Sequence, residues 1–118
     1  MDLVEFLTAR LDEEQAAAEE ALRRTTTTRR MVRGQWMEDT VQPPEWRRSA
    51  WPPARVLAEV DAKRRALTRH RQCGTGIGHC DDGGHAWDEE DGPRGCADLA
   101  DLALPYVDHA DYDEAWRP

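Results

Sequence analysis

"PARVLAEVDAKRRALTRH", residues 53–70, is the stretch that decides the fold class of this chain. Its apolar residues recur at steps of three and four with most of its cations between them, so it predicts an amphipathic helix with one buried stripe. Pro53 suits the first helical position. His70 follows Leu67 by three residues and is expected on the buried edge where this helix ends. The inward stripe comprises Val56, Leu57, Val60 and Leu67.

Toward the N-terminus, residues 1–24 predict another amphipathic helix. The block "DEEQAAAEEALRR" consists of strong helix formers, with acids early and arginines at its end. Asp2 is a suitable N-cap, and Glu5, three residues later, completes a capping-box pattern. The apolar face comprises Leu3, Phe6, Leu7, Leu11, Ala18, Ala21 and Leu22.

Toward the C-terminus, residues 71–95, which are rich in Gly, Cys, His and acids, are expected to form a loop, and residues 96–118 a helical segment. In the latter, "CADLADLAL" predicts a short third helix that ends at Pro105, and "DHADYDEAW" predicts a final turn with Asp108 as its cap. The chain is therefore expected to be a single, mainly α domain over residues 1–118, with two longer helices and short C-terminal helices.

Residues 25–52 form a basic segment rich in Thr, Trp and Pro between the two longer helices. Four consecutive threonines weaken the helix preference and Gly34 favours a turn, so a small β-hairpin is predicted within residues 25–40. A flexible basic loop is the alternative. Two Pro pairs favour extended backbone in the rest of the segment.

The net charge of −8 conceals an asymmetry along the chain. Residues 1–22 carry a net −6, residues 23–72 a net +8 and residues 73–118 a net −10. The basic middle either folds against the acidic ends or forms a face that meets nucleic acid or an acidic partner. The chain has no apolar run of membrane-spanning length and no basic leader, so a reducing cytoplasm is the expected setting for its three cysteines.

The stretch "RHRQCGTGIGHC", residues 69–80, indicates a metal site. The four candidate ligands have the spacing H-x2-C-x6-C-x15-C and are His70, Cys73, Cys80 and Cys96. Three thiolates and one imidazole form an accepted tetrahedral set for structural zinc. His79 or His85 are substitutes for His70, and three cysteines with a water are a further option. Three reduced cysteines without a metal, or a Cys73–Cys80 disulfide, are the alternatives.

Other chemistry is less well supported by the sequence. The alternating glycines follow a predicted helix and precede a run of carboxylates, whereas a phosphate loop follows a strand and opens a helix. Two clusters resemble catalytic pairs: Cys80 with His79, and His109 with Asp108 and Asp111. Neighbours in sequence seldom face each other productively, so no enzyme activity is expected.

The basic segment supplies the candidate partner-binding residues, which are Arg29, Arg30, Arg33, Trp36, Trp46 and Trp51. Exposed Trp and Arg are typical anchors of protein interfaces, so a protein partner is expected. A nucleic-acid-binding regulator that uses residues 23–48 is the first alternative, and a metal-free helical protein-binding domain is the second. A solvated basic face with its Trp side chains turned inward is the interpretation without a partner.

Three stretches also resemble a family of small actinobacterial and actinophage proteins of unknown function. They are "LVEFLTARLDEEQAAA", "PARVLAEVDAKRRALTRH" and "LALPYVDHADYDEAWRP", within residues 1–22, 53–73 and 96–118. The resemblance implies a histidine at the end of the second helix and cysteines before the C-terminal helix, although Ala110 stands where that family usually has proline. It implies no established activity. The sequence therefore predicts a non-catalytic accessory protein with a structural zinc and a protein partner.

Overall fold

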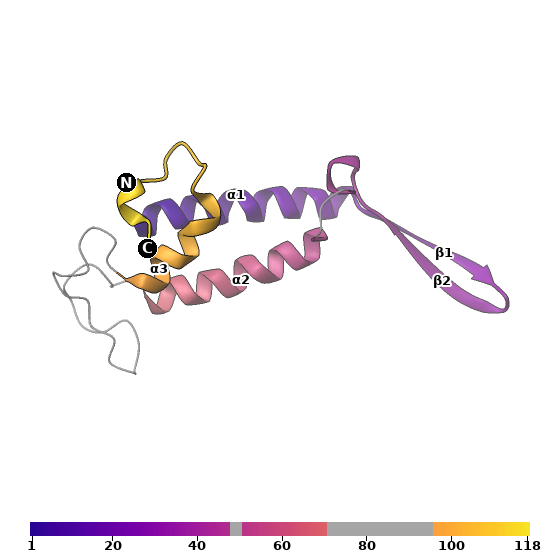
Figure 1. The fold of residues 1–118 in the computed structure, drawn as a ribbon. Helices are drawn as coiled ribbons and strands as arrows, with labels where there is room; N and C mark the ends of the chain where they lie inside the picture. The colour runs from indigo at the N-terminus through magenta and orange to yellow at the C-terminus, as the bar shows by residue number, and fades with distance from the viewer. Residues whose placement is uncertain (48–50, 71–95) are drawn as a thin grey trace. The chain divides into compact units, whose positions relative to one another are not determined.

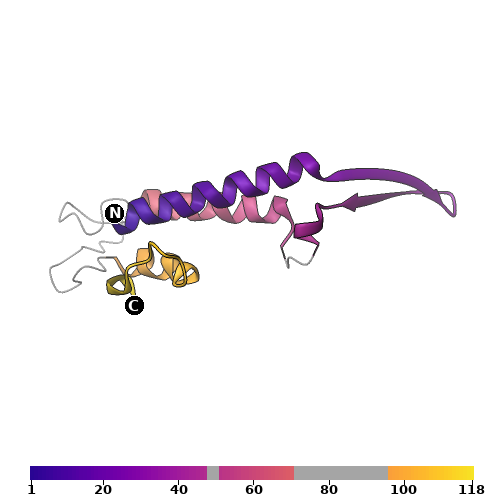
Figure 2. The same ribbon diagram turned by 90° about the horizontal axis from the view of Figure 1, so that it is seen from above.

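The elements follow one another as α1 (Leu3–Arg24), β1 (Thr26–Val32), β2 (Gln35–Val41), α2 (Pro53–Arg69) and α3 (Ala97–Ala103), with short 3-10 turns between and after them (Figure 1). The computed structural model describes residues 1–47, 51–70 and 96–118. The chain divides into two compact units, Met1–Asp12 with Asp61–Pro118, and Glu13–Val60. The long helices α1 and α2 can be followed by their colours in Figure 2. Each contributes residues to both units. The predicted mainly α class with a small hairpin is confirmed.

Helix α1 begins with the predicted capping box. The Glu5 backbone N–H donates to Asp2 Oδ1 at 2.8 Å, and the Asp2 N–H donates to Glu5 Oε2 at 2.9 Å. These two bonds satisfy donors that a helix N-terminus otherwise leaves without partners. Helix α2 starts at Pro53, as expected, and His70 follows its last residue. Of its predicted stripe, Val60 and Leu67 are buried, whereas Val56 and Leu57 are half-buried.

The core of the first unit is built around Phe6, which has no exposed surface. Four rings surround it at centroid distances between 5.1 and 6.1 Å, those of Tyr106, His109, Tyr112 and Trp116. Most of these pairs are edge-to-face, the arrangement that the aromatic quadrupole favours. The first turns of α1 thus bind the C-terminal segment of the chain.

Arg10 lies in the same cluster and is buried, although arginine is rarely buried without a partner. Its guanidinium is 5.2 Å from the Phe6 ring centroid, hydrogen-bonds the His109 ring and lies 3.9 Å from Asp111 Oδ2. A further ion pair joins α1 to α2 within this unit, because Arg64 Nη2 donates to Asp12 Oδ1 at 2.7 Å.

The C-terminal segment begins with α3 (Ala97–Ala103), followed by 3-10 turns at Leu104–Tyr106 and Glu114–Trp116. Leu99, Ala100 and Ala103 form the buried side of α3. The expected role of Asp108 as cap of the final turn was wrong. That turn starts later than predicted, so Asp113 is the residue before it, and its Oδ1 accepts the Ala115 N–H at 2.9 Å.

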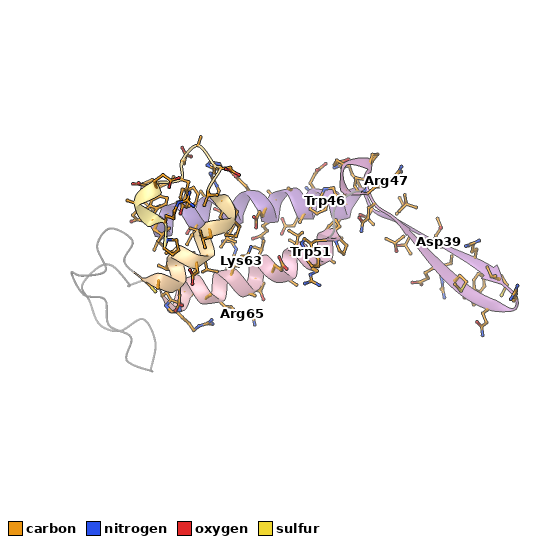
Figure 3. The ribbon with its side chains drawn as sticks, in the orientation of Figure 1. Asp39, Trp46, Arg47, Trp51, Lys63 and Arg65 are labelled. Atoms are coloured by element: carbon orange, nitrogen blue, oxygen red, sulfur yellow. The ribbon has the colours of Figure 1, made fainter. Side chains whose placement is uncertain are left out.

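The second unit carries the hairpin formed by β1 (Thr26–Val32) and β2 (Gln35–Val41). Its two-residue turn is made by Arg33 and Gly34, both with positive φ, at 50° and 80°. This combination is typical of a type I′ turn, which matches the twist of the strands. Every β1 side chain is exposed, as are all of β2 except the half-buried Asp39 (labelled in Figure 3).

The junction of α1 and β1 is held by local bonds. The Thr25 hydroxyl donates to the Ala21 carbonyl at 2.8 Å, and Arg24 bridges Glu20 and Glu45. The hydrogen bond from Arg24 lowers the pKa of the Glu45 carboxyl. Leu22, expected on the buried face, is 40% exposed, because Ala21 takes the inward position and Leu22 lies about 100° further round the helix.

Among the described residues, no helix is both long enough and apolar enough to cross a membrane.

Candidate metal centre

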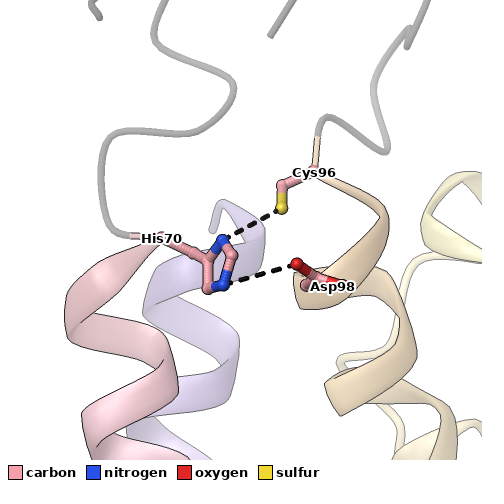
Figure 4. A group of neighbouring side chains, drawn as sticks. All are labelled: His70, Cys96 and Asp98. Atoms are coloured by element: carbon pink, nitrogen blue, oxygen red, sulfur yellow. Dashed lines mark hydrogen bonds and ion pairs between the residues drawn. The ribbon is translucent and has the colours of Figure 1, made fainter. Parts of the chain in front are cut away.

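His70 and Cys96 come together although 25 residues separate them in the sequence. His70 lies at the end of α2, where its backbone N–H still donates to the Ala66 carbonyl at 3.1 Å. Cys96 is the N-cap residue of α3, and its side chain makes no capping bond there. The two residues are 7% and 1% exposed, and His70 Nδ1 lies 3.5 Å from Cys96 Sγ (Figure 4).

Asp98 completes the cluster from the first turn of α3. Its Oδ2 lies 3.4 Å from His70 Nε2, on the opposite side of the imidazole ring from Cys96 (Figure 4). One donor atom from each of the three residues fits within 4.8 Å of the others. Unlike its two neighbours, the Asp98 side chain is 63% exposed.

The two ring nitrogens of His70 therefore differ in what they contact, Nε2 a carboxylate and Nδ1 a thiol. A carboxylate at Nε2 favours the tautomer with the proton there, which leaves the Nδ1 lone pair facing the thiol. One ion can bind only one nitrogen of a ring, so Nδ1 is the nitrogen that could share an ion with Cys96. Zinc bond lengths of about 2.3 Å to sulfur and 2.0–2.1 Å to nitrogen place tetrahedral ligands about 3.5 Å apart. The separation of these two atoms fits that spacing.

Of the four predicted ligands, the structure thus brings two together. Cys73 and Cys80, and the substitutes His79 and His85, lie outside the described residues. Asp98 was not predicted, although its position gives a signal in retrospect. It stands two residues after Cys96 in a helical first turn, where carboxylates are favoured and where a ligand histidine commonly finds a partner.

The predicted partner-binding residues are distributed over the second unit. Arg29, Arg30 and Trp36 are exposed on the hairpin and Arg33 is in its turn. Trp46 lies in the 3-10 turn Pro44–Trp46 and is half-buried. Trp51 is 45% exposed, and the Arg55 guanidinium lies 3.7 Å from its ring centroid (Figure 3).

The arginines of the hairpin are bound by carboxylates of the same hairpin. Arg29 Nε lies 3.4 Å from Glu38 Oε1, and Arg30 Nε donates to Asp39 Oδ2 at 2.7 Å. Both pairs join β1 to β2, so their charges already compensate each other. An arginine held in this way is less available to a phosphate than the sequence suggested.

The fold and this cluster define a small helical protein with a candidate metal centre and an exposed hairpin. The chain belongs to a family of unknown function, DUF6221, whose model matches residues 1–118. No curated protein and no solved structure matched the chain.

Proposed function

We propose that this protein is a non-catalytic interaction protein whose first unit is held together by a structural zinc ion. His70 Nδ1 and Cys96 Sγ supply two ligands, and the thiols of Cys73 and Cys80 supply the others. The observation that carries this proposal is the approach of two buried donor atoms from the ends of α2 and α3 to 3.5 Å. The thiolate-rich set favours zinc over harder ions such as magnesium or calcium.

A metal at this position has a clear physical use. It ties the end of α2 to the start of α3 across residues 71–95, so its binding free energy adds to the free energy of folding. Among the described residues, the buried apolar side chains include one Phe and one Trp, and the others are mostly leucines and alanines. A small core of this kind gains most from an additional cross-link.

The same three side chains could be compared with a thiol–imidazole–carboxylate catalytic triad, but burial argues against catalysis. The Cys96 side chain is 1% exposed, and a nucleophile must reach its substrate. A hollow of about 130 Å³ elsewhere in this unit is lined by Val4, Thr8, Arg64, Leu67 and Thr68, none of which is a general base. These observations support a structural role.

The hairpin supports the interaction role. It exposes five large apolar side chains, Met31, Val32, Trp36, Met37 and Val41, whose exposed fractions range from 37% to 62%. Met31 and Trp36 pair across the strands on one face of the hairpin, and exposed apolar groups that lie together are typical of protein interfaces. Because the neighbouring arginines are paired with Glu38 and Asp39, these contacts favour a protein partner over nucleic acid.

Metal content tests the zinc proposal directly. Purified, untagged protein should contain about one zinc per chain by native mass spectrometry and elemental analysis, as a four-donor site requires. Cys96→Ser should lose the metal and unfold at a lower temperature in zinc-replete buffer. Asp101→Asn, an exposed carboxylate change on the same helix, is the matched control and should retain both.

A protein without metal, with three free thiols and an unfolding temperature unchanged by EDTA, would replace this proposal with the metal-free helical domain. A gel shift that weakens with salt would favour the nucleic-acid alternative.

A further inference from the structure

The pairing register of the hairpin gives it two different faces. Residues that pair across the strands project to the same side, so Thr27 with Thr40, Arg29 with Glu38, and Met31 with Trp36 share one face. We name these six residues the Arg29 face. The other face carries Thr26, Thr28, Arg30, Val32, Gln35, Met37, Asp39 and Val41.

The Arg29 face is exposed along its whole length. Met31 is 55% and Trp36 62% exposed, and the side chains of Arg29 and Glu38 are both 63% exposed. An isolated two-stranded hairpin is only marginally stable in water, and a third layer or strand is what usually stabilises it. The described part of the second unit supplies no such cover to this face.

We propose that the Arg29 face packs against the same face of a second copy of this chain. The contact has a two-fold axis that runs along the strands between the two hairpins. This operation places β1 of one copy over β2 of the other. Each residue then faces, in the second copy, the residue with which it pairs in its own hairpin. Arg29 then faces Glu38 of the second copy, and Glu38 faces its Arg29.

The apolar end of the face is matched by the same operation. Met31 faces Trp36 of the second copy and the reverse, which gives two sulfur–aromatic contacts. Thr27 faces Thr40, where hydroxyls can bond to each other. The face therefore meets itself with opposite charges opposed, apolar groups together and hydroxyls together.

The opposite face lacks this match. The same operation would set Arg30 over Met37 and Thr28 over Asp39, and so would bury two charged groups against groups that do not neutralise them. Each face has one ion pair within the chain, Arg29 with Glu38 and Arg30 with Asp39, so the faces differ in what the second copy would place opposite these charges. This face is therefore left to solvent, and charge complementarity selects the Arg29 face.

The test is the oligomeric state of charge variants, measured by sedimentation velocity over a range of concentrations. A face of six residues is small for a protein interface, so the wild-type dimer should be weak and should dissociate on dilution. Glu38→Arg and Arg29→Glu should each weaken the dimer at least ~10-fold, because like charges then oppose each other. Asp39→Arg, on the opposite face, is the control and should still form the dimer.

Mixing the variants separates a lost contact from a damaged hairpin. Glu38→Arg carries two cations and Arg29→Glu two anions at these positions, so an equimolar mixture should form heterodimers, visible by native mass spectrometry. The double variant R29E/E38R should dimerise as the wild type does. A hairpin that had simply unfolded in the single variants would not be rescued by mixing.

This inference rests on the proposed function only in treating the hairpin as a binding surface, and zinc content measured on the same samples keeps the two apart. A zinc-loaded wild type that stays monomeric overturns the dimer and leaves the metal proposal standing. A wild-type dimer that Glu38→Arg does not weaken also overturns it, since another surface then forms the contact. A dimer that contains no zinc would support the dimer proposal and contradict the metal proposal.

Discussion

The surroundings of the His70 side chain decide which of its two ring nitrogens can bind an ion. The side chain is 9% exposed and lies between a thiol at 3.5 Å and a carboxylate at 3.4 Å. The carboxylate fixes which nitrogen carries the proton, and so which nitrogen can bind an ion. Without Asp98, Nε2 would lose the carboxylate that favours a proton there, and the preference for this tautomer would weaken.

Asp98→Asn should therefore weaken zinc binding about 10- to 100-fold. It should not abolish binding, because the proposed ligands His70 and Cys96 remain. Competition with a chromophoric chelator measures the zinc affinity. Asp101→Asn, on the same helix, should leave the affinity unchanged. Equal affinities in the wild type and Asp98→Asn would mean that the carboxylate does not orient the ring.

Phe6 is the second residue whose environment has large consequences. It contacts four rings and lies beneath the guanidinium of Arg10. Phe6→Leu keeps an apolar group of similar volume but removes the edge-to-face contacts, so we expect it to lower the free energy of unfolding by about 2 kcal/mol. Chemical denaturation followed by circular dichroism measures this loss. Trp36→Ala, on the exposed hairpin, should lower the free energy of unfolding much less.

At the scale of elements, the stability of the hairpin depends on the two turn residues with positive φ, Arg33 and Gly34. Arg33 has a φ of 50°, in a region that Asn and Gly tolerate better than Arg. Arg33→Asn should therefore stabilise the hairpin, and Gly34→Ala, at a φ of 80°, should destabilise it. Cross-strand nuclear Overhauser effects between Met31 and Trp36 report the hairpin population. An Arg33→Asn hairpin no better ordered than the wild type would argue against a type I′ turn.

The helices and the hairpin could be predicted from the sequence because their signals are local. The apolar spacing of residues 53–70, the Asp2 and Glu5 pair, and the threonine run before Gly34 each specify an element without knowledge of the rest of the chain. The ring cluster around Phe6 and the burial of Arg10 depend on the C-terminal segment reaching the first turns of α1. Such long-range contacts leave no periodic pattern in one sequence. Arg10 follows Phe6 by four residues, and its place on the apolar face was the available signal.

In the candidate site, too, the features with local sequence signals could be predicted from those signals, and the contacts between distant residues could not. His70 was predicted on the buried edge at the end of a helix and lies there, and Cys96 was predicted to start the third helix and is its N-cap. Their mutual approach was a hypothesis from ligand chemistry rather than from any periodicity. Asp98 was missed because a carboxylate in a helical first turn has an ordinary explanation of its own.

At the scale of the whole molecule, ion pairs compensate part of the charge asymmetry of the sequence. Within the described residues, Arg24 pairs with Glu20 and Glu45, and two hairpin arginines pair with hairpin carboxylates. Arg64 with Asp12 is a described pair that joins the basic middle to the acidic N-terminal segment. The pairs within residues 23–72 are already counted in the net +8 of that segment, so of the pairs named here only Arg24 with Glu20 and Arg64 with Asp12 offset it.

The division of the chain into two units predicts an uneven response to chelation. The proposed zinc lies in the unit Met1–Asp12 with Asp61–Pro118, so removing it should release the end of α2 from the start of α3. Hydrogen exchange after EDTA treatment should therefore accelerate at amides near the site, such as those of Leu67, Leu99 and Ala100. The strand amides of the hairpin, in the unit Glu13–Val60, should keep their exchange rates because none of the proposed ligands lies there. Equal acceleration in both units would mean that they unfold as one, and no acceleration in either would mean that the first unit is stable without a metal.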